Sequence, residues 1–203
     1  DVPKIKGKVF FDGNQNHLLD GGELPIAGRK IRITGPLTAE RLSDSSGSFT
    51  FNQLPLGTYT VSLISKPDWN QTMPVSPVSY SVSIDTVDDE IETDFGAWSS
   101  TAFHFPANRA WNIISVPGVS ADMSTDALFP LHVTPAFSFF STYETAAELS
   151  PGVGYWIKLS TGHEVWIAGT LSMADTMDVT PGWNFIGSIG ENVPVTSLVD
   201  IPP

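Results

Sequence analysis

Apolar and polar residues alternate through much of the first half of the chain. The clearest alternation covers residues 5–11, 58–63 and 79–84, where apolar side chains are separated by Lys, Thr or Ser. A period of two is typical of a β-strand with one face toward the core and one toward solvent. Weaker or shorter versions of the pattern occur in residues 24–33, 38–42, 48–51 and 90–98. Such strands at regular spacing predict an antiparallel, seven-stranded Ig-like sandwich for residues 1–98.

The second half, residues 99–203, predicts a separate Trp-rich β domain with an internal repeat. It has only two basic residues, Arg109 and Lys158, and most of the Trp and Phe of the chain. The segment Trp111-Asn112-Ile113-Ile114 recurs 72 positions later as Trp183-Asn184-Phe185-Ile186, so the two copies begin near residues 109 and 181. A segment typical of one helical turn follows each copy, at 124–129 and 196–199. Repeats of this kind usually bury their faces against one another.

The second copy is partly truncated, because the sequence reaches Pro203 before any match to residues 154–158. Two interpretations follow. Either the chain is a piece of a longer protein, or the second Trp-Asn segment completes the sheet of the first copy.

A twelve-residue segment between the first two predicted strands, residues 12–23, carries oxygen atoms at regular positions. Oxygen-bearing side chains stand at positions 1, 3, 5, 9 and 12, and the first and last are carboxylates. This is the ligand spacing of an EF-hand calcium loop, in which position 7 contributes a backbone carbonyl. The predicted ligands are Asp12, Asn14, Asn16, the Leu18 carbonyl, Asp20 and Glu23.

Two features distinguish this segment from an EF-hand. Position 6, where an EF-hand has Gly at positive φ, is His17, a residue that tolerates this conformation better than most. The loop also joins strands rather than helices, so we predict Ca²⁺ that stiffens a sandwich edge rather than a sensor that opens a helix pair. The alternative is an acidic surface turn that binds no ion.

Charge and composition narrow the classes of partner. A net charge of −12 and a pI near 4.4 disfavour nucleic acid and anionic membranes. No apolar run approaches the roughly 18 residues that a membrane span needs, so no membrane insertion is predicted. The sequence begins at Asp1 without a signal-peptide pattern, as a mature secreted fragment or a cytosolic protein would. The absence of cysteine excludes disulfides, thiol catalysis and Cys-ligated zinc.

Four motifs occur in the order typical of one domain family. They are Lys6-Gly7-Lys8-Val9-Phe10-Phe11-Asp12, Gly47-Ser48-Phe49-Thr50-Phe51, Leu54-Pro55-Leu56-Gly57-Thr58-Tyr59-Thr60-Val61 and Asp94-Phe95-Gly96. Together with the loop they resemble the SdrD B-like domains, calcium-binding, prealbumin-like sandwiches of bacterial surface adhesins and other large secreted proteins. The resemblance covers residues 4–98. It implies Ca²⁺ in the loop, a spacer role, an extracellular or cell-surface location, and neighbouring domains of a longer chain as partners.

The second half resembles a different pattern. Residues 105–203 are similar to a Trp-Asn and Gly-Tyr-Trp repeat found near the C-terminal ends of large secreted bacterial proteins. This resemblance implies no particular function.

Residues 155–159 and 164–168 are predicted to form a hairpin around residues 160–163. Each strand carries one tryptophan, Trp156 or Trp166, and an outward-facing indole is a suitable platform for a sugar ring. The length of the turn decides whether the two indoles share a face. The alternative is that both are buried where two sheets or domains meet.

The remaining polar residues predict no catalytic centre. No Ser-His-Asp order, nucleophile elbow, phosphate loop or catalytic zinc motif is present, and the four histidines lack metal-site spacing. Asp88-Asp89-Glu90 predicts a solvated turn or, alternatively, a second calcium site. We therefore predict a non-catalytic, calcium-stabilised, adhesin-stalk-like spacer. The alternative is a carbohydrate-binding module that recognises polysaccharide or cell-surface glycan and is appended to an extracellular enzyme.

Overall fold

The computed structural model describes residues 2–173, 176–190 and 194–199, and the chain divides into two compact units. Unit 1 comprises residues 1–107 and 161–168, and unit 2 comprises residues 108–160 and 169–203. The chain therefore leaves unit 1, returns to it for one strand and leaves it again. The predicted boundary near residue 98 differs from this division, since residues 99–107 group with the sandwich.

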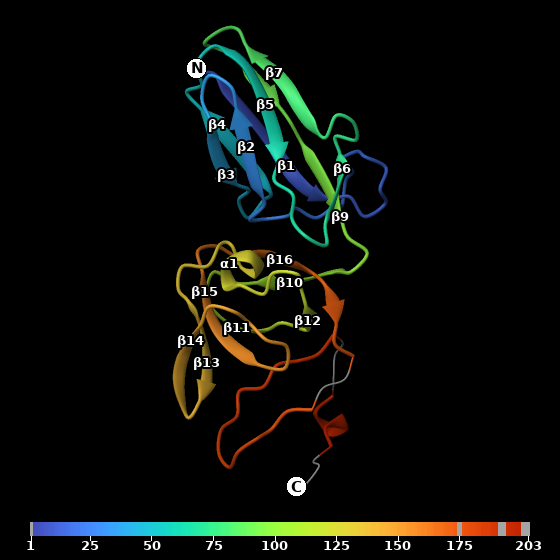
Figure 1. Ribbon diagram of the computed structural model, residues 1–203, viewed down its shortest axis with the longest axis vertical. Helices are drawn as coiled ribbons and strands as arrows, with labels where there is room; N and C mark the ends of the chain where they lie inside the picture. Colours follow the sequence, from blue (N-terminus) through green and yellow to red (C-terminus); the bar gives the residue numbers. More distant parts are fainter. Residues whose placement is uncertain (1, 174–175, 191–193, 200–203) are drawn as a thin grey trace. The chain divides into compact units, whose positions relative to one another are not determined.

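Besides a two-stranded sheet described below, unit 1 contains two larger sheets that pack face to face (Figure 1). One sheet has the order β4-β1-β9-β6, with β8 also paired to β1, and the other has the order β3-β2-β5-β7. The strands of the first sheet are β1 (Lys4–Phe11), β4 (Ser48–Asn52), β6 (Asn70–Met73), β8 (Glu90–Glu92) and β9 (Phe95–Trp98). Those of the second are β2 (Lys30–Thr34), β3 (Ala39–Leu42), β5 (Gly57–Leu63) and β7 (Ser79–Ile84). The predicted all-β class is confirmed.

The core of unit 1 lies between these sheets and follows the alternation of the sequence. In β5, Tyr59 and Val61 are buried, whereas the intervening Thr60 is exposed. The facing sheet contributes Ile5 and Phe95, both fully buried. Burial of apolar surface is the main favourable term in folding, so the alternation decides which face of each strand turns inward.

The sandwich differs from the prediction in two respects. The sequence did not predict β6, whose residues Asn70–Met73 are mostly polar and lie at a sheet edge, where an apolar face is not required. The predicted strand 90–98 is interrupted at Asp94, whose carboxylate accepts a hydrogen bond from the Lys8 amide (2.7 Å). The resulting strands β8 and β9 both pair in parallel with β1, so the sandwich is mixed rather than purely antiparallel.

The predicted hairpin of residues 155–168 is wrong. β15 (Gly154–Leu159) pairs with strands of unit 2, whereas β16 (His163–Ala168) pairs with β10 (Ala102–Ala107) in unit 1. After β15 the Ser160 amide donates to the Leu131 carbonyl (3.1 Å), so the hydrogen bonding of unit 2 continues to residue 160 before the chain returns to unit 1.

Unit 2 is built on one four-stranded sheet with the order β11-β15-β13-β14. Its strands besides β15 are β11 (Ala110–Ser115), β13 (Ala136–Phe140) and β14 (Thr142–Ala146), and a short ladder joins β12 (Gly118–Val119) to β17 (Thr170–Leu171). Across the described parts of both units, no helix is long and apolar enough to cross a membrane.

The predicted helical turns are present in both copies of the repeat. The first is α1 (Thr125–Leu128), whose N-cap Ser124 accepts a hydrogen bond from the Ala127 amide (3.2 Å). The second copy has a 3₁₀ turn, η1 (Val195–Ser197). Residues 200–203, with which the second predicted copy ends, lie outside the described residues.

The two Trp-Asn segments have the same local structure. Asn112 Oδ1 accepts from the Asn108 amide (2.9 Å), and its Nδ2 donates to the carbonyls of Asn108 (2.9 Å) and Ala110 (3.0 Å). Asn184 makes the same three bonds to Thr180 and Gly182, at 3.0, 2.7 and 3.2 Å. The repeat predicted from sequence is therefore a repeated Asn-closed turn.

The second Trp-Asn segment lies against the first copy. The Gly154 amide donates to the Phe185 carbonyl (3.1 Å), and the Gly187 amide donates to the Gly152 carbonyl (2.8 Å). These contacts agree with the interpretation in which the second segment adds to the sheet of the first copy.

The matched turns predict the effect of a glycine exchange. Ala110 has φ 79° and its counterpart Gly182 has φ 106°. A left-handed backbone costs an L-residue about 1 kcal/mol, so Ala110→Gly is expected to stabilise unit 2 by up to about that amount. Gly182→Ala should lower stability, since a Cβ there meets no atom within 4 Å and only the backbone conformation is penalised. Thermal unfolding of both variants checks this, and equal signs for the two changes would contradict it.

Candidate metal site

The loop of residues 12–23 is fastened at both ends to the sandwich. At its start, the Asp12 amide donates to the Ala97 carbonyl of β9 (3.1 Å). At its end, the Leu24 carbonyl accepts from the Phe11 amide (2.9 Å). The loop is thus closed at the end of β1 by backbone hydrogen bonds, which fixes where its side chains can gather.

Asp12, the first predicted ligand, organises the start of the loop. Its side chain is fully buried, and its two oxygens accept from the amides of Asn16 and His17 (both 3.1 Å). His17 has φ 67°, so the loop takes the predicted positive φ at the position where an EF-hand has Gly. The hydrogen bonds to the Asp12 carboxylate and the positive φ of His17 therefore fold the first half of the loop around the Asp12 side chain.

The next three predicted side-chain ligands contact one another. Asp20 Oδ2 accepts from the amide nitrogens of Asn14 (3.0 Å) and Asn16 (2.6 Å). The amide oxygens of the two asparagines accept from the backbone amides of Asn16 and Leu18 (both 3.0 Å). An amide oxygen has two lone pairs, so each of these oxygens retains one acceptor position.

Glu23, the last predicted ligand, has one oxygen without a partner. Its Oε2 accepts from the Asp20 amide (3.1 Å), whereas its Oε1 is buried and has no hydrogen-bond partner. Burial raises the pKa of the Glu23 carboxyl; the hydrogen bond from the Asp20 amide offsets this in part, and the nearby Asp12 and Asp20 carboxylates add to the rise. A carboxylate in these surroundings would be stabilised by a cation.

The residues of the loop fit a hard cation better than a transition metal. Carboxylate, amide and backbone oxygens are the donors that Ca²⁺ prefers. Within the described residues, no three His, Cys, Asp or Glu side chains are placed to hold a metal by themselves. An ion would therefore depend on Asn14, Asn16 and the Leu18 carbonyl as well as on the carboxylates.

The second candidate calcium segment is occupied by other interactions. Asp89 caps its turn by accepting from the amides of Asp85 (2.6 Å) and Thr86 (2.9 Å). Glu90 pairs with Lys4 (2.6 Å) and with Lys6, and these two ammonium groups lower the pKa of Glu90 to about 2. These contacts support the turn interpretation.

Of the two alternatives for Trp166, the structure agrees with burial, because its indole is only 8% exposed. It stacks on Phe11 at a centroid distance of 4.4 Å and contacts Trp69 edge-on at 6.2 Å. Its Nε1 donates to the Pro25 carbonyl (3.0 Å). All four residues belong to unit 1, where Trp166 is a core residue.

Trp156 lies on an aromatic face of the unit 2 sheet that also includes Trp111, Ile113 and Phe137. Strand register places Ile113 and Phe137 opposite Trp156, and directly opposite residues share a face. Trp111 lies 6.2 Å from Phe137 and 6.5 Å from Trp156 between ring centroids, and Phe185 stacks on Trp156 at 6.2 Å. Trp111 is 50% exposed, so an accessible indole on this face is one that the sequence did not indicate as a ligand platform.

Comparisons with known proteins give distant structural likenesses. No family model matches the chain, and no curated protein matches it. The minor pilin of Streptococcus agalactiae is 14% identical, with TM-score 0.34 over 48% of this chain and 44% of that one. The Bacillus anthracis TIE protein is 11% identical, with TM-score 0.39 over 94% and 32%. The major pilin SpaD of Corynebacterium diphtheriae is 11% identical, with TM-score 0.37 over 82% and 57%.

The chain therefore spans less than two thirds of the length of each of these three proteins. At these TM-scores the likeness supports no inference about function.

Proposed function

We propose that unit 1 is a calcium-stabilised structural module, and that the chain is a non-catalytic spacer segment of a secreted or cell-surface protein. The observation that carries the proposal is the oxygen-rich loop, in which Asp12 is fully buried and Glu23 Oε1 is buried without a partner. Burying unpaired carboxylate oxygen is unfavourable, and a divalent cation in the loop would compensate for that cost.

Within this proposal the ligands are those predicted from the sequence. Asp12 and Glu23 would supply carboxylate oxygens at the two ends of the loop. Asn14, Asn16, Asp20 and the Leu18 carbonyl would supply the remaining oxygens. Because the loop is hydrogen-bonded to β9 through Asp12 and its flanking residues Phe11 and Leu24 are bonded to each other, an ion there would stiffen one end of the sandwich.

The location follows from ordinary calcium affinities. Extracellular modules bind Ca²⁺ with Kd values of about 10⁻⁴–10⁻³ M, so such a site fills outside the cell and is largely empty inside it. The resemblance to the SdrD B-like domains supports the same spacer role and the same setting.

Calorimetric unfolding in calcium and in chelator tests the proposal. A ligand that binds only the folded state stabilises it by about 2.7 kcal/mol at a hundredfold excess over Kd. For a domain of this size, 1 kcal/mol moves Tm by roughly 4–8 °C, so the unit 1 transition should rise by roughly 10 °C or more. Mg²⁺ should stabilise less, because it requires stricter geometry and dehydrates reluctantly. Superimposable curves in CaCl₂ and chelator would refute the proposal.

A second candidate function, carbohydrate binding, rests on the half-exposed Trp111 beside Trp156. Exposed aromatic faces suit the apolar faces of sugar rings. Retention on insoluble polysaccharide should then fall in Trp111→Ala and remain unchanged in Trp183→Ala, a variant of the equivalent residue in the second copy. Retention of Trp111→Ala equal to that of the unmodified chain would remove this candidate.

A further inference from the structure

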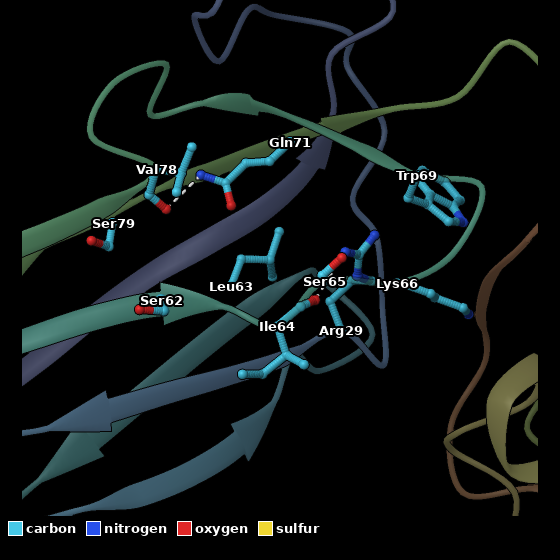
Figure 2. A pocket seen from close by; sticks show the side chains of 10 residues that line it. All are labelled: Arg29, Ser62, Leu63, Ile64, Ser65, Lys66, Trp69, Gln71, Val78 and Ser79. Atoms are coloured by element: carbon cyan, nitrogen blue, oxygen red, sulfur yellow. Dashed lines mark hydrogen bonds between the residues drawn. The ribbon is translucent and has the colours of Figure 1, made fainter.

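A cavity of about 340 Å³ lies in unit 1 and shares no lining residue with the calcium loop. It opens between the end of β5 and the beginnings of β6 and β7, and Arg29 forms part of its wall (Figure 2). Leu63, Trp69 and Val78 supply apolar surface, and Ser65 and Ser79 supply hydroxyl groups. Its volume falls within the range of small-molecule sites, roughly 300–1,000 Å³.

Arg29 is an unusual residue for such a wall, because it is only 5% exposed. Its Nη2 donates a long hydrogen bond to the Ile64 carbonyl (3.4 Å), and its guanidinium lies over the Trp69 ring at 5.3 Å. Its Nη1 is buried and has no hydrogen-bond partner. Among the ion pairs of the described residues, none includes Arg29.

The guanidinium remains charged in spite of its burial. Desolvation lowers the pKa of Arg29 to about 10, which is still well above neutral pH. A buried cation without a carboxylate is expensive, and the stacking on Trp69 compensates only in part. An unpaired charge at the wall of a cavity is therefore expected at a site where a bound ligand supplies the opposite charge.

We propose that this cavity binds a small organic carboxylate through Arg29. The planar guanidinium matches a carboxylate in shape and offers Nη1 as a free donor. The Ser65 hydroxyl, which follows the Ile64 carbonyl that Arg29 contacts, can donate to the second carboxylate oxygen. Leu63, Trp69 and Val78 then face the apolar or ring portion of the ligand, so an acid with such a portion should bind more tightly than acetate.

Nuclear magnetic resonance titration of the full chain tests this with defined probes. 3-Phenylpropionate should shift the backbone amides of Ile64, Ser65 and Ser79, with a Kd of about 1 mM or tighter, and acetate should bind more weakly. The uncharged 3-phenylpropionamide should not bind. Glucuronate tests whether the cavity prefers a sugar acid to an apolar acid. Tighter binding of glucuronate than of 3-phenylpropionate would identify a sugar acid as the ligand.

Arg29→Met separates a binding role from a structural one. Loss of a charge-assisted hydrogen bond should weaken 3-phenylpropionate binding by roughly ten- to hundredfold. The Tm should stay the same or rise, because the variant removes an unpaired buried charge and keeps an apolar side chain. Arg41→Met is the matched control, since Arg41 also lies over an aromatic ring, Phe51, but outside the cavity.

Three results would overturn the proposal. One is that none of the acids shifts the cavity amides, and another is that Arg29→Met binds them as well as the unmodified chain does. The third is a lower Tm for Arg29→Met together with unaltered binding by the remaining folded fraction. This last result would show that the stacking of Arg29 on Trp69 serves only the fold.

Discussion

Glu23→Gln is expected to change the stability of unit 1 in opposite directions with and without calcium. Without calcium, the substitution removes a carboxylate that is partly desolvated and lies near Asp12 and Asp20, so unit 1 should become more stable. With calcium, the same substitution removes a charged ligand of the ion. Most of the roughly 2.7 kcal/mol that saturating calcium contributes should then be lost.

Calorimetry of the variant and the unmodified chain, each in CaCl₂ and in chelator, measures the change in stability with and without calcium. Glu92→Gln is the control, because Glu92 is an exposed glutamate of β8 in the same unit. Its Tm should respond to calcium as that of the unmodified chain does. A destabilised Glu23→Gln variant in chelator would show that the carboxylate supports the loop without an ion, and would contradict the metal-site interpretation.

The pH dependence of stability follows from the same group. The pKa of Glu23 is raised in the folded state, so the folded protein holds a proton that the unfolded chain has already lost. The contribution of Glu23 to stability therefore becomes more unfavourable as pH rises from the ordinary pKa of a glutamate through the raised pKa of Glu23. Calcium binds the deprotonated form, so in CaCl₂ the trend should reverse and stability should increase over that window.

The sequence was most informative where one local rule decides the structure. Alternation identified the central strands, because each of them has one face in a shared core. The ligand spacing of the loop predicted a left-handed backbone conformation at residue 17, and His17 has φ 67°. The 72-residue repeat similarly anticipated the matched turns closed by Asn112 and Asn184.

Features that depend on partners distant in sequence were not predictable. β6 has no apolar alternation, and it forms because β9 offers an edge for pairing. β16 has a suitable strand pattern, but the sequence does not show that it pairs with β10 rather than with β15. The cavity beside Arg29 is formed by segments that lie far apart in the sequence. The sequence indicates it only through Arg29 itself, a basic residue that the strand pattern does not place on an exposed face.

Trp166→Ala is expected to destabilise unit 1 by roughly 3–5 kcal/mol, the usual cost of removing a large buried aromatic side chain. The substitution would remove the stacking on Phe11 and the contact with Trp69, and would leave the Pro25 carbonyl without its donor. Trp183→Ala is the matched control, because Trp183 is 91% exposed and its loss should change stability by no more than about 0.5 kcal/mol.

This experiment also tests whether the returning strand β16 is part of the calcium module. Phe11 is the residue before the loop and Pro25 follows it closely, so Trp166 contacts both ends of the segment that would hold the ion. A fragment that ends at residue 98 lacks this support and should unfold at a lower temperature with a weaker response to calcium. If the fragment and Trp166→Ala instead melt like unit 1 of the intact chain, with the same calcium response, the sandwich of residues 1–98 is sufficient and β16 is an accessory strand.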